Sequence, residues 1–134
     1  MLLKILFVSL VLGIAYSNGA PSCCTKVRVN DGRQKQWGNA ASGVYYANFG
    51  TINGRAHYTS KEGGLAIWYD SKNWAIGLES VQVFKDVEEN WNGVFHFVSS
   101  KENCPNNLDP WTWKYRDGYV WENTQVGLSI VCEN

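Results

Sequence analysis

The sequence predicts an all-β domain, a compact antiparallel β-sandwich or barrel-like domain closed by two disulfides, with a two-sheet sandwich favoured. Short β-prone runs recur along the chain and are separated by Gly, Asn and Asp turn residues. No window of a dozen residues places apolar side chains at helical spacing. Four cysteines follow an export signal, which favours disulfides in a small domain.

That export signal opens the chain. Lys4 gives a basic start, residues 5–15 are mostly apolar, and Ser17 and Gly19 offer two cleavage points. We therefore expect a signal peptide over 1–19, a single domain over 20–134, and a secreted, extracellular protein. No second apolar stretch reaches the ~20 residues that cross a bilayer, so no membrane insertion is expected.

Alternation of polar and apolar residues predicts the first strand over 26–30, and Asp31-Gly32 then predicts a turn. A β-prone run over 43–46 predicts the second strand. Asn53-Gly54 predicts a tight hairpin turn, because both residues tolerate positive φ, and 56–59 is the returning strand.

The second half of the chain continues the same pattern. Strands are predicted over 65–69 and 74–78, on either side of a polar turn, and an alternating piece predicts another over 81–84. An apolar run over 94–98 has the composition of a central strand. After a polar, turn-rich stretch, clean alternation predicts a strand over 111–115. Asp117-Gly118 indicates a further hairpin, and the last strand is predicted over 126–132.

The four cysteines allow three pairings. A bridge between the neighbours Cys23 and Cys24 would need a strained peptide geometry. The other two pairings tie the N-terminus to Cys104 and Cys132, and we favour Cys24 with Cys132 and Cys23 with Cys104. Four thiols without C-x-x-C spacing are a poor zinc site, so no metal and no cofactor is expected.

The near-zero net charge of the chain argues against nucleic acid as a partner. Twelve basic residues, including Lys4 of the signal, face twelve acidic ones, so the mature domain is close to neutral. Such a domain has no long-range field to attract nucleic acid, and none is expected as a partner.

Several short motifs occur in order between Gly43 and Cys132. They are Gly43-Val44-Tyr45, Asn53-Gly54-Arg55 with Tyr58, Trp74-Ala75-Ile76-Gly77, Cys104-Pro105 and a Trp at 111 or 113. The arrangement resembles a small β-rich module (G-x-Y, N-G-R-x-x-Y, W-x-I-G) of marine invertebrate and protist proteins. The resemblance implies a compact all-β unit with structural aromatic residues and implies no established activity.

Seven tryptophans are the strongest compositional feature. Indole rings stack on the apolar faces of sugars, and they also fill cores. Trp37 and Trp91 lie among turn residues and are the best ligand-contact candidates. Trp111 and Trp113 would share one face of a strand, either as a core face or as a flat binding platform. Arg55, on the predicted turn, would either bind an anion or cover an aromatic ring.

No catalytic residue is predicted. No nucleophile has an activating motif, and neither His57 nor His96 has a partner at ligand spacing. We therefore expect a secreted, non-enzymatic recognition or extracellular-matrix module whose partner is an extracellular glycan or matrix protein, with glycan contact through loop aromatics. The alternative is a secreted effector acting on a protein target, such as a venom component, pheromone or defence factor.

Overall fold

A computed structural model describes residues 23–32, 41–82, 86–90, 92–117, 120–123 and 127–134. The predicted signal peptide lies outside these residues, as do Trp37, Trp91 and Phe84. No helix within the described ranges is long and apolar enough to cross a membrane.

Nine strands account for the regular structure of the described chain: β1 (Lys26–Asp31), β2 (Gly43–Ala47), β3 (Tyr58–Ser60), β4 (Leu65–Tyr69), β5 (Asn73–Leu78), β6 (Val94–Ser99), β7 (Lys114–Asp117), β8 (Val120–Asn123) and β9 (Leu128–Cys132). Two short 3-10 helices, η1 (Glu79–Val81) and η2 (Pro105–Asn107), interrupt the connections. The all-β prediction is confirmed.

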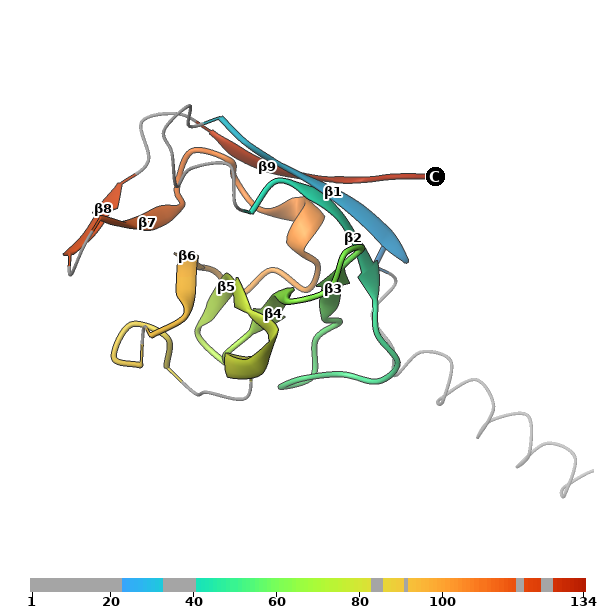
Figure 1. The fold of residues 1–134 in the computed structure, drawn as a ribbon, viewed down its shortest axis with the longest axis horizontal. Coiled ribbons are helices and arrows are strands. Elements are labelled where there is room, and N and C mark those ends of the chain that lie inside the picture. Colours follow the sequence, from blue (N-terminus) through green and yellow to red (C-terminus); the bar gives the residue numbers. More distant parts are fainter. Residues whose placement is uncertain (1–22, 33–40, 83–85, 91, 118–119, 124–126) are drawn as a thin grey trace, which may run out of the picture.

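The strands form one antiparallel sheet in the order β8-β7-β6-β5-β4-β3-β2-β1-β9. From β1 to β8 each strand therefore pairs with its sequence neighbour, and β9 returns to pair with β1 (Val27 opposite Cys132). Figure 1 shows the sheet curling into a half-barrel, with the η2 segment between β9 and β3–β5. The domain is thus barrel-like, and the prediction of two separate sheets is wrong: the sheet curls over itself instead.

The inner face of the curled sheet carries the larger core. It includes Val27 and Val29 of β1, Ile67 of β4, Ile76 of β5 and Ile130 of β9, all at most 5% exposed. The spacing of two between Val27 and Val29 follows from the alternation of side chains across a sheet.

The opposite face of β4, β5 and β6 is buried as well. Ala66, Trp68, Ala75 and Phe97 form a second cluster there, covered by Val87 from the β5–β6 connection. Because both faces of β4 and β5 are covered, these strands read as continuous apolar runs.

Asp70 fixes the turn between β4 and β5. Its Oδ1 accepts hydrogen bonds from the backbone N–H groups of Lys72 (2.8 Å) and Asn73 (2.6 Å). Its Oδ2 accepts from the backbone N–H of Val87 (2.7 Å) and from Asn73 Nδ2 (3.1 Å). The buried carboxylate is thus satisfied by four donors, and it ties the covering segment to the turn.

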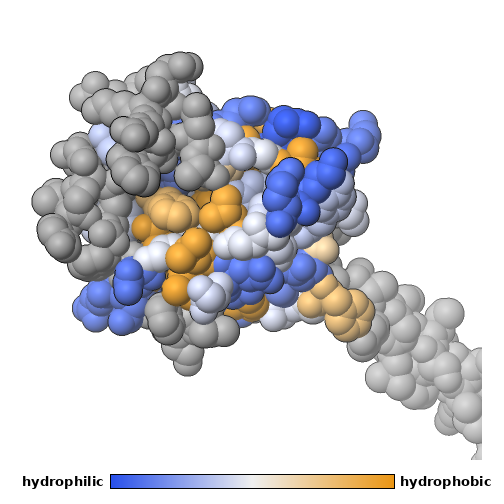
Figure 2. Space-filling model, in the orientation of Figure 1, coloured by the Kyte–Doolittle hydropathy of each residue, from blue (hydrophilic) through white to orange (hydrophobic). Residues whose placement is uncertain are grey.

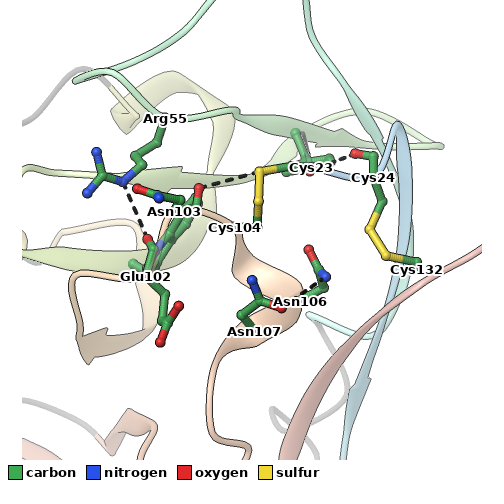
Figure 3. The surroundings of a disulfide bond; sticks show 11 residues. Cys23, Cys24, Arg55, Glu102, Asn103, Cys104, Asn106, Asn107 and Cys132 are labelled. Atoms are coloured by element: carbon green, nitrogen blue, oxygen red, sulfur yellow. Dashed lines mark hydrogen bonds between the residues drawn. A yellow bond between two sulfur atoms is a disulfide. The ribbon is translucent and has the colours of Figure 1, made fainter. Parts of the chain in front are cut away.

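Both favoured disulfides are present. Cys23 pairs with Cys104 and Cys24 with Cys132, with Cα–Cα distances of 5.4 and 5.6 Å. Figure 3 shows the adjacent cysteines reaching two different parts of the chain, one at the start of η2 and one at the end of β9.

Two predicted strands are misplaced. Residues 81–82 do not extend a strand, because the chain turns into η1 directly after β5 and Gln82 continues that turn. The strand predicted over 111–115 begins only at Lys114, since the preceding residues form a turn. By contrast, the Asn53-Gly54 turn is confirmed: both residues have positive φ, and Ile52 and Arg55 exchange backbone hydrogen bonds.

Candidate functional site

The turn over 109–112 presents an exposed indole on a fixed backbone. The backbone N–H of Trp111 donates to Asp109 Oδ1 (2.9 Å), and the Thr112 hydroxyl donates to the Asp109 carbonyl (3.1 Å). The side chain of Trp111 is 64% exposed. The sequence therefore folds locally as an Asx-type turn that holds the ring outward.

A second contact anchors this turn to the sheet. The backbone N–H of Leu128, the first residue of β9, donates to the Pro110 carbonyl at 2.8 Å. Beneath the ring lies Gly127, where an added Cβ would sit 3.6 Å from Trp111 Cη2. The indole thus rests beside the start of β9 and keeps most of its surface in water.

Trp113 does not accompany Trp111 at the surface. It is 1% exposed and packs in the inner core, where its ring meets the His96 ring edge-on at a centroid distance of 6.5 Å. Because β7 starts only after Trp113, the two tryptophans do not share a strand face. The structure therefore gives Trp113 the core role and leaves Trp111 as the exposed member of the pair.

The contacts of Arg55 indicate a structural role. Its guanidinium lies over the Tyr69 ring at 4.6 Å, and its N–H groups donate to the backbone carbonyls of Glu102 (3.4 Å) and Lys101 (3.3 Å). Trp74 Nε1 donates to the same Glu102 carbonyl at 2.9 Å. Arg55 thus fastens the segment before Cys104 to the sheet, as Figure 3 shows for Glu102.

The two histidines occupy different environments. His57 is half-buried, with Nδ1 3.1 Å from the Asn48 side-chain amide, which donates to it. His96 is buried, with Nε2 3.1 Å from Asp31 Oδ2. In the described part of the chain, no group of three His, Cys, Asp or Glu side chains could hold a metal ion.

Two buried phenols are electrostatically perturbed. Burial raises the pKa of Tyr58 to about 12, and its hydroxyl donates to the Cys24 carbonyl at 2.7 Å. Burial, with a smaller contribution from Glu62, also raises the pKa of Tyr45, whose hydroxyl donates to Ala41. Both phenols serve as neutral donors within the core.

Sequence reasoning missed Phe49. This residue is fully exposed in the β2–β3 connection, beside a pocket of about 290 Å³. The available signal was its position between Asn48 and Gly50, because an aromatic residue among turn formers was the reason for selecting Trp37 and Trp91. Those two tryptophans lie outside the described residues, so Trp111 and Phe49 are the aromatic candidates whose surroundings are known.

Apolar side chains gather near the centre of the face seen in Figure 2, bordered by hydrophilic residues.

No family model, no curated protein and no solved structure matches the chain.

Proposed function

We propose that this protein is a secreted, non-enzymatic recognition module that contacts an extracellular glycan through Trp111. The observation that carries the proposal is the exposed indole on a turn fixed by three hydrogen bonds, from Trp111, Thr112 and Leu128. A rigid aromatic surface loses little conformational entropy on binding, and its apolar face suits the C–H face of a pyranose ring.

Polar groups beside the ring support a sugar ligand. Asp109 and Thr112 are exposed and flank the indole within the same turn. Asp109 Oδ1 holds the backbone of the turn, and the hydroxyl groups of a sugar could pair with its other carboxylate oxygen. An aromatic face with a few directional polar groups is the usual composition of a small-ligand site.

The buried histidine supports a role without catalysis. His96 and Asp31 form the kind of imidazole–carboxylate contact that orients a catalytic base, but both side chains are sealed in the core. A general base must reach the proton that it abstracts, and the His96 side chain is only 3% exposed. The pair therefore serves the fold.

A glycan array probed with the oxidised mature domain tests the proposal. We expect binding to at least one saccharide class and at least a tenfold loss of affinity in Trp111→Ala. Tyr46→Ala is the matched control, because Tyr46 is also an exposed aromatic residue (43%) but lies on β2. A second arm uses Trp37→Ala with Trp91→Ala. Equal loss in Trp111→Ala and Tyr46→Ala, or an array without any specific signal, would refute glycan recognition by Trp111.

A further inference from the structure

The connection from β2 to β3 places a hydrophobic projection beside a hydrophobic recess. Phe49 is fully exposed, and the adjacent pocket has a volume of about 290 Å³. The lining residues come from the first described segment, from the end of β2 and from this connection: Cys23, Cys24, Thr25, Ala47, Asn48, Phe49, Gly50, Thr51 and Ala56.

The pocket has the size and chemistry for a phenyl ring. An apolar cavity of about 150 Å³ accepts one benzene molecule, so the recess can take a Phe side chain and part of its backbone. The disulfide-bonded Cys23 and Cys24, together with Ala47 and Ala56, provide the apolar wall. None of these nine described lining residues is charged, so an entering aromatic group meets no unpaired charge among them.

We propose that the occupant is a second copy of this chain, and that two protomers exchange Phe49 side chains across a two-fold axis. A two-fold interface needs one patch that is complementary to itself. This patch meets that requirement, because it holds both the projecting ring and the recess that fits it. Each ring enters the partner's pocket, and because Phe49 also lines its own pocket, the two rings meet near the axis.

Charge favours this occupant over a charged partner. In a symmetric contact every residue near the axis faces its own copy, so a charged lining would repel itself. The uncharged lining removes that penalty, and the exposed Thr25 and Thr51 supply a polar rim. The contact is small, which places it among weak, concentration-dependent associations.

Sedimentation velocity of the oxidised mature domain, from about 10 μM to about 1 mM, tests the proposal. We expect a dimer whose fraction rises with concentration. Phe49→Ser should raise the dissociation constant by at least about 30-fold, the effect of removing a residue that dominates an interface. Because Phe49 is exposed, this change leaves the fold intact, which circular dichroism checks. Leu78→Ser is the control: Leu78 is an exposed apolar residue (41%) at the far end of β5 and should leave the association unchanged.

A complementation experiment with two variants distinguishes the exchange of Phe49 side chains from non-specific association. Thr51→Trp fills the recess and keeps Phe49, whereas Phe49→Ser lacks the ring and keeps the other eight lining residues. Each variant alone should associate less than the wild type, and an equimolar mixture should associate more than either variant alone, through the one remaining ring-in-pocket contact. A monomeric wild-type protein at about 1 mM, association that is insensitive to Phe49→Ser, or a mixture that associates no more than its separate components would overturn the proposal. This result is independent of glycan binding, because no ligand is present.

Discussion

His96 Nε2 lies 3.1 Å from Asp31 Oδ2, and this buried contact joins β6 to β1 across the inside of the curled sheet. The two strands are separated by four others in the sheet order, so the contact holds the curl rather than a neighbouring pair. We infer that this polar contact stabilises the curled shape of the half-barrel.

Removing the imidazole should therefore be costly. His96→Ala leaves the Asp31 carboxylate buried without this partner, and we expect a loss of about 3–5 kcal/mol in the free energy of unfolding. His57→Ala is the control, since the half-buried His57 side chain accepts a hydrogen bond from the neutral Asn48 amide, and it should cost about 1 kcal/mol. Urea unfolding of both variants measures the difference. Equal losses would show that the buried contact contributes no more than the half-buried hydrogen bond of His57.

The two disulfides should stabilise by similar amounts. They join residues 81 and 108 positions apart, and the chain-entropy model gives about 4–5 kcal/mol for each, differing by only a few tenths. Replacing Cys23 and Cys104 with Ala, and separately Cys24 and Cys132, should lower the unfolding free energy accordingly in guanidinium titrations. A bridge whose removal costs less than about 1 kcal/mol would contradict this expectation.

Alkaline pH should destabilise the domain through its buried phenols. An unfolded tyrosine ionises near pH 10, whereas burial raises the pKa of Tyr58 to about 12. The folded state thus keeps a proton that the unfolded state loses, so this contribution to stability is complete below pH 10 and declines as the pH rises towards 12. Tyr58→Phe should flatten that decline. The test is the unfolding free energy at several pH values. A phenolate absorbance titration in which every tyrosine of the native protein ionises near pH 10 would rule this out.

Gly77 should tolerate no side chain. A Cβ there would lie 2.4 Å from the Gly93 carbonyl oxygen and 2.9 Å from Val94 Cα, where the pairing of β5 with β6 shifts register. Because the obstructing atoms are backbone, we expect Gly77→Ala to cost about 1–3 kcal/mol. Gly127→Ala is the control: its Cβ would have no neighbour closer than 3.5 Å, so its effect should stay within about 0.5 kcal/mol. Comparable thermal stabilities of the two variants would show that β6 moves aside freely.

Local patterns predicted most of the strands because their cause is local. Alternation located β1 and the apolar run located β4, and the positive φ values of Asn53 and Gly54 follow from their residue types. The exclusion of one cysteine pairing was also predictable, because adjacent cysteines cannot readily pair with each other, whereas the choice between the remaining two pairings is set by the tertiary fold. Val81 was misassigned because apolar residues that cover a sheet look like apolar residues within it. Val81 packs against the outer cluster from η1.

The candidate site was harder to predict, since exposure is a tertiary property. Trp111 and Trp113 are equivalent in an alternating pattern, and only the Asp109 turn and the late start of β7 separate an exposed ring from a buried one. The curl of the sheet could not be predicted from local sequence patterns either, because the Asp31–His96 contact joins residues 65 positions apart in the sequence.

We propose that a saccharide stacks on the exposed indole of Trp111. The most direct measurement is an NMR titration of the indole N–H signals with a saccharide selected on the array, the Trp111 signal being assigned by its absence in Trp111→Phe. We expect a saturable shift of the Trp111 signal and little change in the signal of Trp113, which is buried. A saccharide that binds without moving the Trp111 signal would contradict it.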